Sequence, residues 1–176
     1  MEFDIQTQRL GLRNWKESDI ETFAAMCADP EVMRYFPSIL NYKETVDLVN
    51  RLEKHYHTYG FTYYALVDLT TENFIGFTGM LHQTWDSEYT PCVDLGWRLQ
   101  RESWGKGFAT EAANACVEHA FKKLNIDELY AFATDNNKPS QHVMDKIGMS
   151  YQGNFQHPKI KGDTRFKHCV AYKITS

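Results

Sequence analysis

Hydrophobic and polar positions change their period several times along the chain, and each change marks an expected element. Residues 7–13 alternate between apolar and polar side chains, which is typical of a half-buried strand. A helical period follows over 18–28, with Ser18 as the expected N-cap. A second helical stretch covers 42–60. The first sixty residues therefore predict one strand and two helices.

The remainder of the chain switches repeatedly between strand and helix patterns. Two strands separated by a turn at 70–73 predict a hairpin, and later strands alternate with helices. The expected strands are 61–68, 74–81, 92–99, 128–134, 149–155 and 165–174, and the expected helices are 108–123 and 139–147. This order predicts a mixed α/β domain whose strands are antiparallel early in the chain.

Length and charge narrow the classes of protein that fit this pattern. The 176 residues suit a single domain spanning 1–176, and 43% hydrophobic with 24% charged residues is the balance of a globular chain. A net charge of −4 argues against a nucleic-acid binder. No apolar run is long enough to cross a bilayer, so no membrane partner is expected. The four cysteines form no C-x-x-C pair and the first residues lack a secretory pattern, which together predict a reduced, cytoplasmic protein.

A glycine-containing segment between a strand and a helix carries the strongest chemical signal. It reads Trp104-Gly105-Lys106-Gly107-Phe108-Ala109-Thr110. Glycines permit a tight turn with outward N–H groups, and the helix N-terminus adds positive potential, so a phosphate or pyrophosphate is expected there. A P-loop would need Ser or Thr after Lys106, and a dinucleotide fingerprint would need a small residue in place of Thr110. An ordinary glycine turn is the alternative.

The segment resembles the pyrophosphate loop of the GNAT acetyltransferases. Their pattern, Gln/Arg-x-x-Gly-x-Gly/Ala, maps onto Trp104, Gly107 and Ala109, with Trp in the first position as in the branch of ribosomal-protein N-terminal acetyltransferases. Other segments resemble the same branch in the same order along the chain. They are 7–13, 29–36, 94–99, 137–140 and 143–149.

The resemblance implies a fold and a co-substrate. The fold would be a central mixed, mostly antiparallel sheet of about seven strands with a V-shaped splay, flanked by about four helices. Acetyl-CoA would be the co-substrate, with no metal. Its pantetheine arm would pair with the strand backbone, and its pyrophosphate would meet the glycine loop. The residues expected to bind it are Trp97, Arg98, Leu99, Trp104, Gly105, Lys106, Gly107, Phe108, Ala109, Thr110, Asn137 and Ser140.

Acetyl transfer needs a neutral amine, which identifies the expected catalytic groups. Deprotonating an α-amine at pH 7 costs about 1.4 kcal/mol, and deprotonating a lysine costs roughly 4.6 kcal/mol. Asp94 matches the strand carboxylate that serves as base in several GNAT members, and a solvated or ion-paired strand acid is the alternative. Many members place a Tyr where this chain has Met144. Ser140 is the expected substitute as hydrogen-bond donor to the departing thiolate, and a structural hydroxyl is its alternative.

The acceptor is the least specified part of the expected reaction. Arg34, Tyr35, Phe36 and Trp85 stand in loops and, with Asp94, are the expected acceptor-binding residues. The resemblance favours a primary amine at a protein or peptide N-terminus, attacking directly in a ternary complex. A small-molecule amine acetyltransferase and a non-catalytic acetyl-CoA-binding regulator are the alternatives. Either a monomer or a homodimer is expected.

Overall fold

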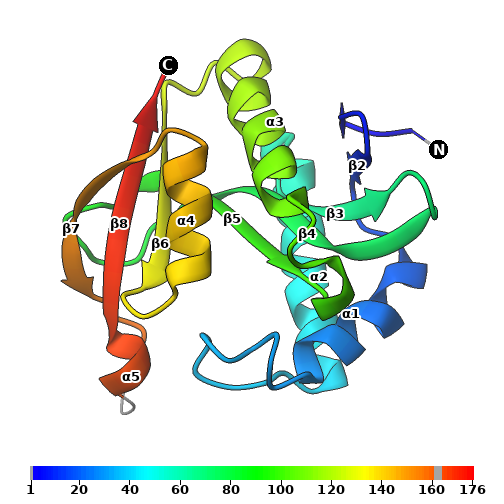
Figure 1. The fold of residues 1–176 in the computed structure, drawn as a ribbon, viewed down its shortest axis with the longest axis horizontal. Coiled ribbons are helices and arrows are strands. Elements are labelled where there is room, and N and C mark those ends of the chain that lie inside the picture. The colour runs from blue at the N-terminus through cyan, green and yellow to red at the C-terminus, as the bar shows by residue number, and fades with distance from the viewer. Residues whose placement is uncertain (1, 161–163) are drawn as a thin grey trace.

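A computed structural model describes residues 2–160 and 164–176, and its centre is one eight-stranded sheet (Figure 1). Every neighbouring pair of strands is antiparallel except β5 and β6, which are parallel. In spatial order the strands are β1 (Ile5–Gln6), β2 (Leu10–Arg13), β3 (Tyr63–Asp68), β4 (Asn73–Gln83), β5 (Cys92–Leu99), β6 (Glu128–Thr134), β8 (His168–Thr175) and β7 (Ser150–Gln156).

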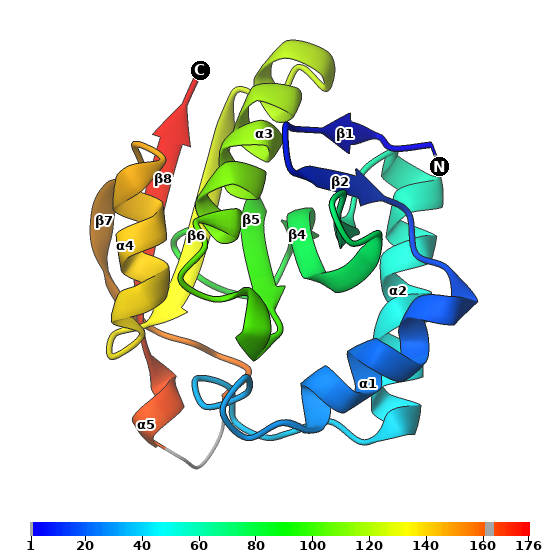
Figure 2. The same ribbon diagram turned by 45° about the vertical axis from the view of Figure 1, so that its right-hand side comes forward.

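Helices cover both faces of this sheet (Figure 2). The long helix α3 (Phe108–Lys123) and α4 (Lys138–Lys146) lie on one face, and α1 (Ile20–Ala28) and α2 (Tyr42–Tyr59) lie on the other. A fifth helix, α5 (Thr164–Lys167), is a single turn before β8. Each face has its own core, because side chains alternate between the two sides of every strand.

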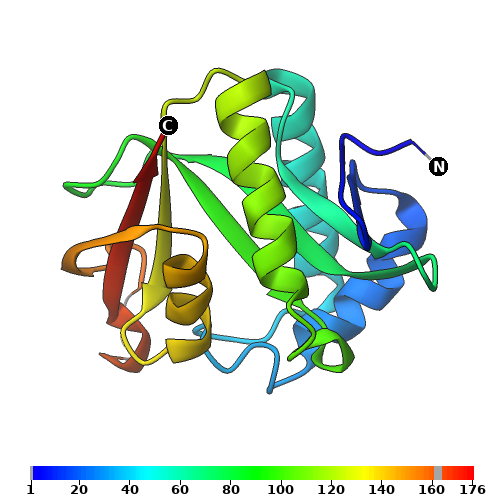
Figure 3. The same ribbon diagram turned by 45° about the horizontal axis from the view of Figure 1, so that its top comes forward.

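The parallel pair β5–β6 is where the sheet opens. Only Asp94 and Tyr130 are in register between these strands, and beyond them the strands diverge as a V (Figure 3). The Gln100 N–H donates to the Ile75 carbonyl at 3.0 Å. In an antiparallel ladder, hydrogen-bonded and non-hydrogen-bonded residue pairs alternate, so the Trp97–Thr78 pair is not hydrogen-bonded. The backbone N–H and C=O of Trp97 therefore point away from β4. They face the opening toward β6. The expected splay is therefore present, and buried backbone groups of this kind require partners.

The structure confirms the fold class and most of the expected elements. The bounds of 92–99, 108–123 and 128–134 are reproduced by β5, α3 and β6. The eighth strand, which was not expected, is the two-residue β1. The extra helix is α5, whose single turn occupies the first residues of the strand expected at 165–174, so β8 begins at His168. Among the described residues, no helix combines the length and hydropathy that a membrane span needs.

The expected N-cap at Ser18 is wrong. Ser18 lies inside a 3₁₀ turn over Glu17–Asp19, and α1 begins only at Ile20. Asp19 governs this turn, because its carboxylate accepts the Lys16 N–H at 2.9 Å and pairs with Arg13 at 2.7 and 2.8 Å. A buried ion pair therefore outweighs the local preference for serine at a helix start.

Candidate active site

Asp94 lies at the apex of the splay, on the sheet face that α1 and α2 cover. Its side chain is buried, with 8% of the residue exposed. The Tyr63 hydroxyl donates to its two carboxylate oxygens at 2.8 and 2.7 Å, and the Gln83 amide donates to one of them at 3.2 Å. Gln83 in turn accepts from the Trp85 indole N–H at 3.1 Å. Three strands and a loop thus hold one carboxylate in place.

Burial changes the acidity of this carboxylate. Loss of solvent raises the pKa of Asp94 from 3.8 to about 7, although the hydrogen bonds from Tyr63 and Gln83 act to lower it. A group that titrates near neutral pH can accept a proton and release it again, as a general base requires. Asp94 forms no ion pair among the described residues, so the alternative of an ion-paired strand acid does not describe it.

Tyr63 and Gln83 are site residues that sequence reasoning missed. Tyr63 of β3 lies opposite Gly79 of β4, and Gly79 lies opposite Gly96 of β5. A Cβ on Gly96 would come within 2.8 Å of the Tyr63 ring, so the tyrosine reaches across to β5 only because glycine stands there. The signal for Tyr63 in the sequence was the pair of glycines, Gly79 and Gly96. These two residues can be recognised as neighbours only when the register of the strands is known.

The glycine loop lies at the other end of β5, where α3 begins. Gly105 and Gly107 adopt φ values of +74° and +78°, a conformation that favours glycine, and Gly107 is the N-cap of α3. Trp104, Gly105, Lys106 and Gly107 are exposed, whereas Phe108 is buried. The loop residues before α3 are thus exposed at the end of the helix that carries the positive end of its dipole.

Arg9 of the β1–β2 connection braces this loop and adds a second cation. Its guanidinium donates to the Lys106 carbonyl at 3.1 Å and pairs with Glu111 of α3 at 2.5 Å. It also lies 4.7 Å from the centre of the Phe108 ring, and the Lys106 ammonium lies 5.9 Å from the same ring. Sequence reasoning missed Arg9, because nothing in its local sequence places it beside residues about one hundred positions later.

Trp104 links the loop to the splayed strand. Its indole N–H donates to the Leu99 carbonyl at 2.8 Å, although the residue is 40% exposed. The side chain therefore satisfies the last carbonyl of β5 and sets the distance between the strand and the loop. This contact gives a physical reason for Trp at a position where the family pattern usually has Gln or Arg.

The start of α4 faces the opening from β6. Asn137 is the N-cap of α4, and its side chain accepts from the Ser140 N–H at 3.2 Å. Ser140 is half-buried, and Met144 one turn later is buried in the core shared with α3. The Asn137 side chain, which was expected to bind acetyl-CoA, caps this helix. Ser140 lies on the first turn of α4 and is the only residue with a side-chain hydroxyl within Lys138–Lys146.

The expected acceptor residues divide into two groups. Arg34 lies over the rings of Tyr35 at 4.8 Å and Trp104 at 5.4 Å, so the loop between α1 and α2 approaches the glycine loop. Phe36 lies 4.0 Å from the guanidinium of Arg98 on β5.

Trp85 belongs to a separate aromatic cluster. It is 8% exposed and stacks on Phe155 at 5.6 Å, with Phe132 and His157 nearby. Its link to the site is the hydrogen bond to Gln83. Trp85 therefore positions Gln83, which in turn donates a hydrogen bond to the Asp94 carboxylate.

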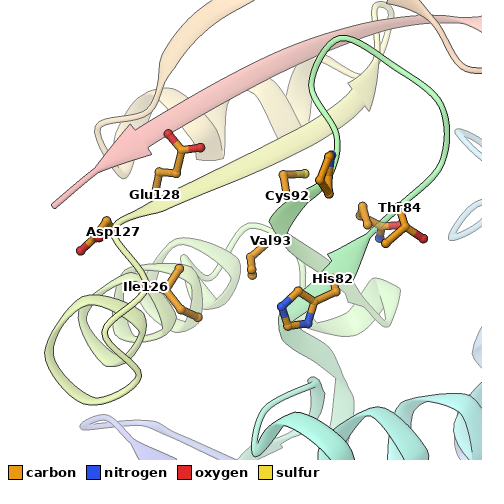
Figure 4. Close-up of a pocket in the computed structure, with 9 residues that line it drawn as sticks. His82, Thr84, Cys92, Val93, Ile126, Asp127 and Glu128 are labelled. Atoms are coloured by element: carbon orange, nitrogen blue, oxygen red, sulfur yellow. The ribbon is translucent and has the colours of Figure 1, made fainter.

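A pocket of about 370 Å³ lies between the start of β5 and the segment that leads into β6, on the other side of the Asp94–Tyr130 pair from the opening (Figure 4). Figure 4 shows His82, Cys92 and Val93 across from the segment that leads into β6. Its lining residues are His82, Gln83, Thr84, Pro91, Cys92, Val93, Ile126, Asp127 and Glu128. It contains neither Asp94 nor the glycine loop, and therefore differs from the site described above. No group of His, Cys, Asp and Glu in the described part of the chain could hold a metal.

Comparison with known proteins shows the family to which this fold and sequence are related. The acetyltransferase (GNAT) domain family matches residues 9–150. The uncharacterized protein YkkB of Bacillus subtilis is 31% identical over 148 residues, covering 84% of this chain and 85% of its own. A GNAT-family acetyltransferase from Bacillus anthracis superposes with a TM-score of 0.80 at 25% identity, covering 97% of each chain.

A spermidine N-acetyltransferase from Vibrio cholerae, solved in complex with CoA and spermine, superposes with a TM-score of 0.75. It is 20% identical, and the alignment covers 96% of each chain. At this identity the likeness concerns the fold alone.

Proposed function

The chain belongs to the GNAT acetyltransferase family, whose members transfer an acetyl group from acetyl-CoA to an amine, and we propose that Asp94 is the base of this reaction. The enzyme is thus an acyltransferase with acetyl-CoA as donor. The observation that carries the proposal is a buried carboxylate with a pKa of about 7 at the apex of the splay. The proposed acceptor is a primary amine that attacks the thioester directly.

The residues of this chain fit acetyl-CoA. The Trp97 backbone groups that face the opening would pair with the amide-rich pantetheine arm. The N–H groups of 105–110, with Lys106 and Arg9, would hold the pyrophosphate. The bound thioester supplies an activated acetyl group. Beside it, a strand N–H that points into the opening would donate to the carbonyl oxygen as negative charge develops.

Two side chains, Asp94 and Ser140, would assist the loss of the amine proton and the departure of the thiolate. Asp94, directly or through one water, would accept the proton that the amine loses as its nitrogen attacks the thioester carbon. Ser140, at the opposite wall, would donate a hydrogen bond to the departing sulfur, which needs little help because a thiol is a good leaving group. Tyr63 and Gln83 would keep the Asp94 oxygens oriented without touching the reacting atoms.

Two acceptor classes remain proposals for this site. The resemblance to the ribosomal-protein branch favours a protein or peptide N-terminus, whose low amine pKa suits a base that titrates near pH 7. The relative solved with spermine is named for a small amine. The test is release of free thiol from acetyl-CoA with a panel of peptides, amino acids and polyamines. Absence of turnover with every amine, in a protein that binds CoA, would favour the non-catalytic alternative.

Ser140→Ala is expected to lower kcat about three- to tenfold, because the hydrogen bond matters most when charge develops on sulfur. CoA affinity, measured by calorimetry, should stay within about twofold of wild type. Ser150→Ala, on the exposed start of β7, is the matched control and should change neither quantity. An unchanged kcat for Ser140→Ala would make Ser140 a structural residue of the α4 N-terminus.

Tyr63→Phe is expected to move the rising limb of the pH–rate profile to higher pH. The tyrosine hydroxyl bonds the charged form of Asp94 and so lowers its pKa against the effect of burial, and removing the hydroxyl raises that pKa. The plateau at alkaline pH should be largely retained. Tyr64→Phe is the matched control, because its buried hydroxyl has no hydrogen-bond partner among the described residues. Equal profiles for Tyr63→Phe and Tyr64→Phe would remove Tyr63 from this role.

A further inference from the structure

Arg98 is a half-buried cation that nothing in the described structure neutralises. Its Nε is buried without a hydrogen-bond partner, and it forms no ion pair with a carboxylate of the described residues. One guanidinium nitrogen contacts the Cys27 sulfur at 3.4 Å, and the rings of Phe36 and Phe77 lie 4.0 and 5.4 Å from the guanidinium carbon. A charged group whose Nε is withdrawn from solvent is normally hydrogen-bonded or paired, and Arg98 has no such partner at Nε.

The groups around Arg98 cannot supply the missing negative charge. Burial raises the pKa of the Cys27 thiol, which is therefore neutral near pH 7. Burial also raises the pKa of Tyr63 well above its usual value, and the Asp94 charge beside it adds to the shift. Burial lowers the pKa of Arg98, but a guanidinium remains a cation at physiological pH. The two aromatic rings stabilise this cation without neutralising it.

The position of Arg98 connects it to the acceptor. Residues 94 and 98 of β5 have the same parity, so both side chains lie on the face that α1 and α2 cover, about 13 Å apart along the strand. Tyr63 spans the interval, because its hydroxyl bonds Asp94 and its ring stacks at 5.1 Å on Phe77, the cross-strand neighbour of Arg98. The same face of one strand thus presents a carboxylate for an amine and, farther along, a guanidinium for an anion.

The geometry points to an acceptor that carries a carboxylate as well as its amine, namely a short peptide long enough to reach both groups, with Arg98 as the residue that selects it. This inference rests on the proposed function, because it places the amine at Asp94. A carboxylate can accept two parallel hydrogen bonds from a guanidinium, which Phe36 would uncover by a movement of its loop. A polyamine brings only positive charge to this face and is repelled by the unpaired guanidinium of Arg98.

The experiment compares matched acceptors by thiol release from acetyl-CoA. A dipeptide is paired with its C-terminal amide, and a tripeptide with its own C-terminal amide, each at a known free-amine concentration. Wild type should prefer the carboxylate member by about tenfold or more in kcat/KM. Arg98→Met should abolish that preference, and Arg98→Lys should retain part of it, because lysine keeps the charge but loses the planar fork. Arg101→Met, at an exposed surface arginine, is the control and should keep the wild-type preference.

The outcomes separate this inference from the proposed function. Equal rates for carboxylate and neutral acceptors in wild type would overturn the inference and leave the acetyltransferase activity intact, and this result needs no variant to fold. A preference that survives in folded Arg98→Met would also overturn it. Absence of turnover with any amine would instead contradict the proposed acceptor chemistry at Asp94.

Discussion

Gly107→Val is expected to weaken CoA binding by about 100-fold or more, a loss of roughly 3 kcal/mol. Gly107 holds a φ of +78° at the N-cap of α3, where a β-branched residue is strained, so the turn that presents the loop N–H groups must change. A Cβ there would meet only the Arg9 guanidinium, at 3.6 Å, and otherwise point into the open space where a phosphate would lie. Calorimetry with CoA measures the effect.

Gly60→Val is the matched control for this variant. Gly60 has nearly the same φ, +77°, and no atom within 4 Å of an added Cβ, but it ends α2 far from the glycine loop. Both variants should lose stability through backbone strain, and only Gly107→Val should lose CoA affinity. If folded Gly107→Val binds CoA as wild type does, the pyrophosphate does not lie on this loop.

The elements that could be predicted are those whose signal is local. The helix 108–123 begins where a glycine in a left-handed conformation precedes a clear helical period, and its bounds were reproduced by α3. The N-cap at Ser18 failed because a partner outside the helix, Arg13, engages Asp19. Local pattern cannot anticipate an ion pair that competes for the same turn.

The candidate site also contains residues that the sequence could identify and residues that only the three-dimensional structure reveals. The glycine loop was predicted from its local motif, and Asp94 was predicted from the resemblance to GNAT members. Tyr63 and Arg9 reach the site through strand register and loop packing, and no local pattern encodes either contact. Arg98 was expected to contribute its backbone, whereas the structure shows a half-buried side chain with an unpaired Nε against the Phe36 ring, on which our further inference rests.

Asp94→Asn is expected to lower kcat about 100-fold or more near neutral pH, because asparagine keeps the size of the side chain but cannot accept the amine proton. The wild-type rate should rise through about pH 7 as Asp94 loses its proton. The variant should rise at higher pH, with the acceptor amine itself, near ~8 for an α-amine. The deficit should be largest for acceptors of high amine pKa and smallest at alkaline pH. Thiol release across pH measures both.

The same substitution has a second, opposite effect on stability. Asp94 has a pKa of about 7 in the folded chain against 3.8 for an ordinary aspartate, so between these values the folded state binds more protons than the unfolded state. Wild-type stability should therefore fall as pH rises from about 4 to 7, whereas Asp94→Asn lacks this loss. At pH 8 the variant should be the more stable by up to about 4 kcal/mol, and near pH 4 the difference should largely vanish.

These two readouts together distinguish a base from a structural acid. A catalytic carboxylate held at a raised pKa costs stability at neutral pH, because burial disfavours the charged form that the reaction uses. Slower turnover combined with higher stability is the expected signature, checked by thiol release and by Tm on one preparation. Wild-type kinetics in a more stable variant would mean that water takes the proton. Lost activity with lost stability would mean that the Tyr63 and Gln83 contacts require the charge for folding.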